Sequence, residues 1–234
     1  CRGQARGSVT SESYPCPLPG GAAAREYALS FDKGRAVRML VVPALFDEAN
    51  KLRHLTVEVM RRLHGAGIDC FLPDLPGTNE SLRDLAGVEL EDWRMAVEAA
   101  ARHFGATHLL ALRGGGLLVP GGLPGWLYAP VKGASLLKTM LRARILASRE
   151  AGLEETSEAL LERGLEQGLE LAGFILSGEM IRQLQAAMPA GDARLTVIEQ
   201  DLVEGRPLWL RAEPDHDPAQ ADALAAIVSL GCKA

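Results

Sequence analysis

The chain has 234 residues, of which 47% are hydrophobic and 24% charged, and its formal net charge is −5. This is the balance of an ordinary globular protein, long enough for one α/β domain with a small insertion. Lysine and arginine are spread along the chain. The spread argues against nucleic acid as a partner, because neutralising phosphates requires a concentrated basic face.

Cysteine usage and hydropathy predict a cytoplasmic protein. The four cysteines form no CxxC pair, and Cys70 lies in an apolar segment, as a buried thiol would. The first residues lack the hydrophobic core of a signal peptide, and no apolar run approaches the ~18 residues that a membrane span needs. We therefore expect no membrane span.

The first half of the chain alternates strand patterns with helix patterns. Residues 1–23 are rich in Gly, Ser and Pro and are expected to be poorly ordered, ahead of a single domain over 24–234. Strands are predicted at 25–31, 36–46, 68–77 and 107–113, with helices at 49–67 and 90–105. Short links between apolar strands and amphipathic helices are typical of a parallel sheet covered by helices on both faces.

The second half begins with a predicted strand at 125–130 and continues into helical patterns. Residues 135–170 carry no strand signal and are expected to form a helical cap inserted between the later strands. A short strand and a helix follow over 170–188, then strands at 193–200 and 207–214. Asp217 and Pro218 form a strong helix start, with aspartate as the N-cap and proline at the first helical position.

The segment "HLLALRGGGLLVP" (residues 108–120) is an apolar strand that ends in a glycine turn. In a G-x-S-x-G elbow the nucleophilic serine stands at this turn, and here Arg113 takes its place. Arginine stays protonated and cannot act as a nucleophile. Two interpretations remain open: Arg113 makes a structural salt bridge or lies in solvent, or Arg113 and the Gly114 amide clamp an anion at a helix N-terminus.

A polar cluster, "FDEANKLR" (residues 46–53), follows the first buried strand. By position, the backbone amides of an oxyanion hole would come from Leu45 or Phe46 and from Gly114. Ligands of open α/β sheets bind at the carboxyl ends of strands. The candidate ligand-binding residues here are Glu48, Asn50 and Lys51, with a possible ion-pair network to Arg113, and Asp74 is a second acid that could hold Arg113. The alternative is a solvated helix start.

His216 stands between a late strand pattern and the last helix, where an α/β hydrolase carries its catalytic histidine. Asp201 is the best positional match to the catalytic acid, and His216 would then activate water. The alternative is an exposed loop histidine. The remaining histidines show no metal-ligand spacing, so neither a metal nor a cofactor is expected.

Four segments resemble a known family in the order in which they occur. "DLPGTNES" is similar to the D-x-P-G-x-G-x-S turn of the α/β-hydrolase superfamily. "VVPALFDEANKLRHL", "ALRGGG" and, later, "LYAPVKGASLLKTMLRARIL" with "LAGFILSGEM" resemble the second type of exosortase A system-associated hydrolases, in which arginine replaces the serine. The resemblance implies an α/β-hydrolase fold with a cap, and a cytosolic accessory role in exopolysaccharide production and protein sorting in Gram-negative bacteria.

Two functions from different classes follow as hypotheses. The first is a non-catalytic or atypical accessory protein that binds an acidic or acyl small molecule and meets exopolysaccharide-assembly proteins. The second is a serine-independent hydrolase of acyl esters or thioesters that uses His216 to activate water. The oligomeric state stays open, with a homo-oligomer as one option.

Overall fold

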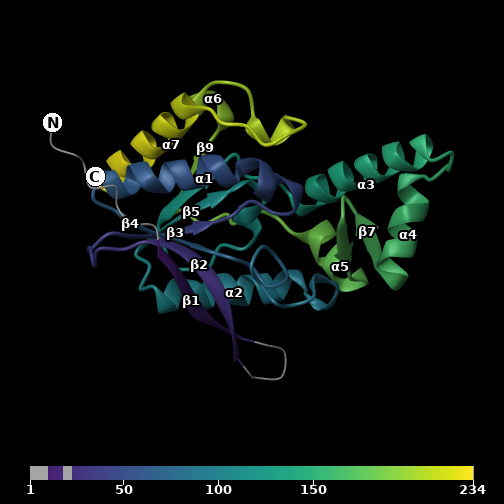
Figure 1. The fold of residues 1–234 in the computed structure, drawn as a ribbon, viewed down its shortest axis with the longest axis horizontal. Coiled ribbons are helices and arrows are strands. Elements are labelled where there is room, and N and C mark those ends of the chain that lie inside the picture. The colour runs from purple at the N-terminus through teal and green to yellow at the C-terminus, as the bar shows by residue number, and fades with distance from the viewer. Residues whose placement is uncertain (1–9, 18–22, 234) are drawn as a thin grey trace.

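The computed structural model describes residues 10–17 and 23–233. At its centre is a seven-stranded sheet in the order β1-β2-β4-β3-β5-β6-β9 (Figure 1). Its strands are β1 (Thr10–Pro17), β2 (Ala23–Phe31), β3 (Arg38–Val42), β4 (Asp69–Pro73), β5 (His108–Leu112), β6 (Gly125–Tyr128) and β9 (Leu195–Ile198). From β4 to β9 the strands run parallel, whereas β2 is antiparallel to both β1 and β4.

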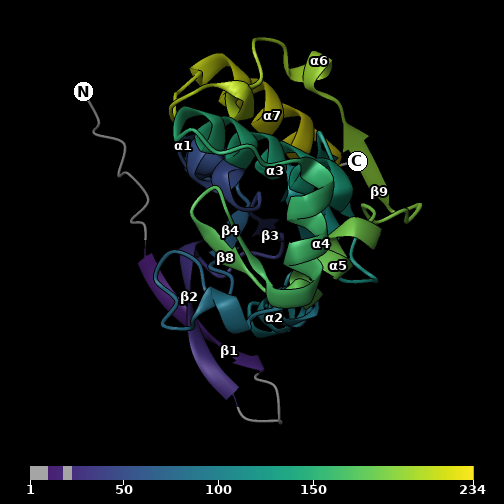
Figure 2. The same ribbon diagram turned by 90° about the vertical axis from the view of Figure 1, so that its right-hand side faces the viewer.

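Helices cover both faces of this sheet. The helices α1 (Asp47–Gly65) and α7 (Pro218–Gly231) pack together on one face, and α2 (Leu90–His103) lies on the other (Figures 1 and 2). Each face buries its own cluster of apolar side chains, with Leu52 and Leu224 on the first and Trp93 on the second. Burial at about 25 cal/mol per Å² of apolar surface makes these two clusters the main stabilising contribution to the fold.

The cap is a separate layer beyond the carboxyl ends of the parallel strands (Figure 1). It consists of α3 (Gly133–Glu150), α4 (Ser157–Gln167), a hairpin of β7 (Leu169–Leu171) and β8 (Phe174–Leu176), and α5 (Gly178–Ala186). The helical segment predicted at 135–170 is thus present as two helices, and the insertion extends further to include the hairpin and α5. The hairpin turns through Ala172 (φ 51°) and Gly173 (φ 82°), a backbone geometry of tight two-residue hairpins.

Two local predictions differ from the structure. Residues 10–17, expected within a poorly ordered segment, form β1, because Tyr14 is fully buried and its hydroxyl donates to the Asp74 carbonyl at 2.8 Å. The rest of that segment before residue 23 lies outside the described residues. The strand predicted at 207–214 is wrong: these residues contain only the short 3-10 helix η3 (Leu208–Leu210), which packs against α1, and β9 pairs with no strand beyond it among the described residues.

The predicted N-cap of the last helix is confirmed. The Asp217 carboxylate accepts from the backbone N–H groups of Ala219 and Gln220, and Pro218 takes the first helical position. In the described part of the chain, no helix is both long enough and apolar enough to cross a membrane.

Candidate functional site

The elbow follows β5 and is built on Arg113. The backbone of Arg113 has φ 51°, a conformation that costs energy for a residue with a side chain and that clusters at functional turns. The chain then forms the 3-10 helix η2 (Arg113–Leu117) instead of an α-helix. A five-residue 3-10 helix does not present the N-terminal dipole that the anion-clamp interpretation requires.

Each of the three guanidinium nitrogens of Arg113 donates to a protein group. Its Nε and Nη2 donate to the two carboxylate oxygens of Glu48 at 3.0 and 2.9 Å, and Nη1 donates to the Ala129 carbonyl at 2.8 Å. The planar group also lies over the Trp209 ring, 4.1 Å from its centroid. Paired bonds of this kind are among the strong charge-assisted interactions, and the stacked ring adds a cation–π contribution.

Arg113 therefore connects the end of β5, which it directly follows, to three other elements. Glu48 lies in the first turn of α1, Ala129 follows β6, and Trp209 lies in η3. Trp209 in turn packs edge-on against Tyr128, with 5.9 Å between ring centroids. With side-chain exposures of only 13% for Arg113 and 16% for Glu48, the pair is largely shielded, and an incoming anion would compete with Glu48 for the guanidinium.

The glycines after Arg113 are explained by close packing. A Cβ on Gly115 would lie 2.5 Å from the carbonyl oxygen of Pro43, and one on Gly114 would meet the side chains of Leu136 and Leu45 at 2.8 and 3.0 Å. The elbow thus lies directly against the chain that leaves β3. The anion-clamp interpretation requires the backbone of Gly114 to come close to a ligand, whereas the space beside its α-carbon is filled by leucine side chains.

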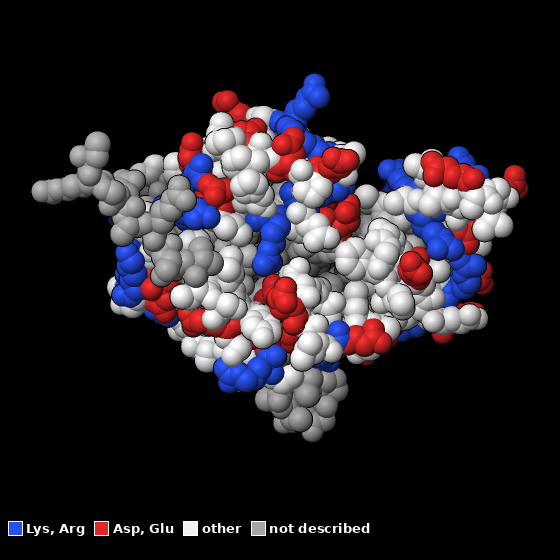
Figure 3. Space-filling view, viewed as in Figure 1, with Lys and Arg blue, Asp and Glu red and all other residues white. Residues whose placement is uncertain are grey.

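A pocket of about 290 Å³ opens next to the elbow, and neither Arg113 nor Gly114 lines it. Four segments form it: the β3–α1 turn with the start of α1, the loop after β4, the start of α2 at Trp93, and the cap hairpin. Its lining residues are Pro43, Ala44, Leu45, Phe46, Ala49, Asn50, Leu75, Gly77, Thr78, Asn79, Leu85, Trp93 and Phe174. The face of the molecule seen in Figure 3 is hollowed between the main body and the cap.

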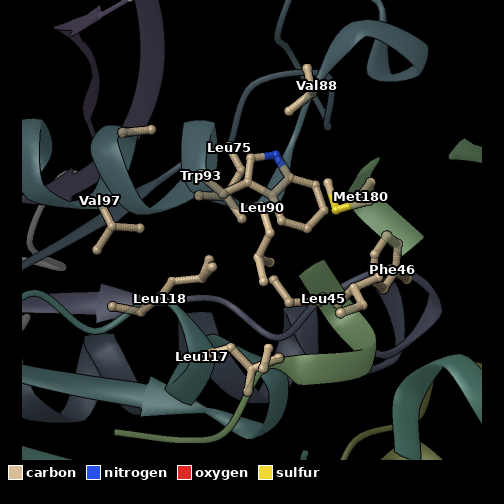
Figure 4. Packing of buried hydrophobic residues seen from close by; sticks show 14 of the residues in the cluster. Leu45, Phe46, Leu75, Val88, Leu90, Trp93, Val97, Leu117, Leu118 and Met180 are labelled. Atoms are coloured by element: carbon tan, nitrogen blue, oxygen red, sulfur yellow. The ribbon is translucent and has the colours of Figure 1, made fainter. Parts of the chain in front are cut away.

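The floor of the pocket is apolar and its rim is polar. Leu45, Phe46, Leu75 and Trp93 are each no more than 5% exposed, and Figure 4 shows Leu45 and Phe46 beside the Trp93 ring. Asn50 and the loop residues after Leu75 supply the polar rim. Phe46 has φ 56° and ψ −134°, a second strained backbone conformation bordering the site.

The remaining members of the predicted polar cluster lie apart from Arg113. Lys51 pairs with Asp47 at 2.7 Å, one turn earlier on α1. Asp74 is buried and accepts from Asn79 Nδ2 at 2.8 Å and from Arg53 at 3.4 Å, so it holds its own loop rather than the elbow. Within the described residues, the Arg113–Glu48 pair is thus the part of the predicted ion-pair network that forms.

The structure does not bring His216 and Asp201 together by any hydrogen bond. The His216 ring stacks on His54 of α1, with centroids 4.0 Å apart and planes 6° apart, and its Nδ1 is buried without a partner. Asp201 is exposed on α6 (Gln200–Val203). A catalytic histidine is held in orientation by an acceptor on one ring nitrogen, which is a carboxylate in the Ser-His-Asp triad. In the described residues His216 has a second imidazole against its face and no such acceptor on Nδ1.

Within the described ranges, no three His, Cys, Asp or Glu side chains gather as metal ligands. Of the residues that line the pocket, Leu45, Phe46 and Asn50 were predicted from the sequence, whereas Trp93 and Phe174 were not. The Trp209 ring over Arg113 was not predicted either. Those aromatic residues come from α2, β8 and η3, and no local pattern marks elements that meet only in the fold.

No family model matches the chain, and no curated protein matches it. Among solved structures, it is similar to a putative hydrolase from Agrobacterium vitis S4, with 16% identity and a TM-score of 0.50 over 94% of this chain and 99% of that one. The fold is α/β-hydrolase-like. This confirms the predicted fold class, and at such an identity the likeness shows the fold alone.

Two further solved structures are more distant. Est1E from Butyrivibrio proteoclasticus, described with bound ferulic acid, has 15% identity and a TM-score of 0.47 over 77% of this chain and 68% of that one. A proline iminopeptidase-related protein from Thermus thermophilus has 19% identity and a TM-score of 0.43, over 66% and 56%.

Proposed function

We propose that this α/β-hydrolase-like protein binds a small molecule in the pocket beside the elbow and does not catalyse acyl transfer there. The observation that carries the proposal is the Arg113–Glu48 ion pair. The position of the usual nucleophile holds a side chain that cannot attack a carbonyl and whose three guanidinium nitrogens each donate to Glu48 or to the Ala129 carbonyl. The elbow thus serves as a structural tie between α1, β6 and η3.

The ligand site in this proposal is the pocket, not the elbow amides. Some of the ligand-binding residues that the sequence indicated line this pocket, namely Leu45, Phe46 and Asn50. Others do not, namely Glu48, Lys51, Arg113 and Gly114. A concave, mostly apolar site with a few polar groups at its rim is the usual form of a small-molecule pocket.

The alternative is hydrolysis by water that His216 activates. His216 has a buried, unpaired Nδ1, which is the atom that an orienting acid would contact. Among the described residues, the one carboxylate bonded to His216, that of Asp215, accepts from its backbone N–H and not from the ring. His216 is also absent from the pocket lining. These two observations favour binding over catalysis.

The biological setting that we propose rests on the sequence resemblance. The four segments similar to exosortase A system-associated hydrolases suggest an accessory role in exopolysaccharide production, in contact with its assembly proteins. Deleting the gene in its host should lower exopolysaccharide output, and complementation with His216→Ala should restore it. Normal output in the deletion strain would remove this setting.

Turnover of short and medium acyl esters and thioesters tests the proposed function. The panel is assayed with the wild type, Arg113→Ala, His216→Ala and, as a matched control, His54→Ala, which removes the stacking partner of His216. We expect hydrolysis at the buffer rate for all four proteins. Turnover by the wild type that is lost in His216→Ala and kept in His54→Ala would overturn the proposal in favour of the hydrolase.

A further inference from the structure

The side chains that line the pocket carry no charge. Of the thirteen lining residues, Asn50, Thr78 and Asn79 have polar side chains, and none is Asp, Glu, Lys, Arg or His. The cations nearest along α1 are engaged elsewhere: Lys51 with Asp47, and Arg53 with Asp74. A charged group moved into this apolar floor would lose its hydration without gaining a counter-ion, so the lining selects an uncharged group.

Three aromatic rings from distant parts of the chain meet at this pocket. The Phe46 ring lies 5.4 Å from Trp93 with planes 50° apart, and 5.5 Å from Phe174 with planes 72° apart. These are the tilted and edge-on arrangements that aromatic groups prefer. A further aromatic ring in the cavity would extend this pattern. Such a ring would gain ring–ring contacts in addition to apolar burial, whereas an alkyl chain would gain the apolar burial alone.

The orientation of the Trp93 ring is set by the protein. Trp93 Nε1 donates to the Pro76 carbonyl at 2.8 Å, which leaves the Trp93 indole without a free donor. The polar group of a ligand must then be met at the rim. The Asn50 side chain is exposed there and makes no hydrogen bond within the described part of the chain, so both its donor and its acceptor are available.

We propose that the pocket takes an uncharged aromatic group whose polar substituent reaches the Asn50 amide. The proposal deepens the proposed function and rests on it. Phe174 lies directly after the tight turn of the β7–β8 hairpin and reaches Phe46 across the cleft, so the cap contributes one wall of the ring site. An anionic ligand, which one of the two interpretations of Arg113 implied, is disfavoured in this pocket by the same lining.

Three probes of one carbon skeleton test the ligand class by isothermal titration calorimetry with the wild-type chain. They are 2-naphthamide, decahydro-2-naphthamide, which lacks the aromatic system, and 2-naphthoate, which carries a charge. We expect 2-naphthamide to bind at least about tenfold more tightly than either of the others, a difference of about 1.4 kcal/mol. Equal or tighter binding of the saturated amide, tighter binding of the carboxylate, or no binding of 2-naphthamide would each overturn the proposal.

Variants place the binding in this pocket. Phe174→Leu keeps an apolar side chain and removes the ring, and we expect it to weaken 2-naphthamide about tenfold while the affinity for the saturated amide changes little. Tyr27→Leu, an exposed aromatic residue of β2 outside the pocket, is the matched control and should leave all three affinities unchanged. Unchanged affinity in a folded Phe174→Leu would contradict the ring site.

The two proposals fail in distinguishable ways. Ester turnover dependent on His216 would overturn the non-catalytic function whichever probe binds. Absence of turnover combined with absence of 2-naphthamide binding would leave the non-catalytic function in place and remove only the aromatic ligand.

Discussion

Arg113 and Glu48, which are 65 residues apart in the chain, form a two-point ion pair that occupies the elbow of this α/β-hydrolase-like fold. Arg113 comes directly after β5, and Glu48 lies in the first turn of α1. The pair connects the two strand ends at which such a fold assembles its chemistry. What remains for ligand binding is the apolar pocket beside it, between the main body and the cap.

Restoring serine at the elbow should not restore hydrolysis. Arg113→Ser supplies a hydroxyl, but His216 stacks on His54 and lacks an acid partner among the described residues, so nothing is placed to deprotonate that hydroxyl. We expect ester turnover of Arg113→Ser to equal that of Arg113→Ala. A higher turnover for the serine variant would show that a base does reach the elbow.

Gly115 and Gly116 of the elbow should differ sharply in how much stability is lost when each is replaced by alanine. Gly115→Ala would place a Cβ 2.5 Å from the backbone oxygen of Pro43, and we expect it to lower the free energy of unfolding by about 2 kcal/mol. Gly116→Ala meets nothing closer than 3.6 Å and should change stability by less than about 0.5 kcal/mol. Urea unfolding of both variants measures the difference, and equal stability would mean that the elbow does not pack this closely on β3.

Much of the sheet was predictable because its strands are continuous apolar runs. The segments "MLVV" and "LLAL" are buried on both faces, as parallel strands between helix layers are, and the pattern alone identifies them. β1 was missed because its two prolines and polar residues weaken the strand pattern, and because the burial of Tyr14 and Cys16 depends on tertiary contacts that the local sequence does not show.

Only part of the candidate site was predictable from the sequence, because several of its residues are brought together by tertiary contacts. The Arg113 position follows from the elbow motif, and Glu48 was one of several charged residues that could meet it. The strand predicted at 207–214 was wrong because Trp209 is used in a tertiary contact over Arg113, not in a sheet. Trp93 and Phe174 join Phe46 only through the arrangement of α2 and the cap.

Replacing one residue of the cap hairpin by glycine should increase the stability of the fold. Ala172 has φ 51°, where the left-handed conformation costs a residue with a Cβ about 1 kcal/mol. Ala172→Gly should therefore raise the free energy of unfolding by up to about 1 kcal/mol, as measured by thermal unfolding. The matched control is Ala151→Gly at the end of α3, where φ is −85° and no strain is relieved, so this variant should not be stabilised.

Glu26 should make stability fall as the pH rises above the ordinary range of a carboxyl group. Burial raises the pKa of Glu26, although the Ser81 hydroxyl and the Arg83 charge act in the opposite direction. Between the unfolded value of about 4.3 and the raised value, the folded chain binds more protons than the unfolded chain. The free energy of unfolding then decreases as the pH rises through this window, and the loss persists at pH 7.

Glu26→Gln tests this pH dependence. One carboxylate oxygen of Glu26 is buried without a partner, so the neutral amide should stabilise the fold at pH 7 by about 1 kcal/mol, with a smaller gain at pH 4. Urea unfolding at both values measures the change, with Glu98→Gln, an exposed partner of Arg102, as the control for loss of one negative charge. A variant less stable than the wild type at pH 7 would contradict the assignment.

The central claim is that Arg113 is a structural tie, and a double-mutant cycle tests it most directly. The free energy of unfolding is measured for the wild type, Arg113→Ala, Glu48→Ala and the double variant. The structure predicts a loss of about 2 kcal/mol for Arg113→Ala and a coupling energy of at least about 1 kcal/mol between the two positions, because each single change leaves a largely shielded charge without its partner. A coupling below about 0.3 kcal/mol would mean that the two residues act independently, and the elbow arginine would again be free to hold a ligand.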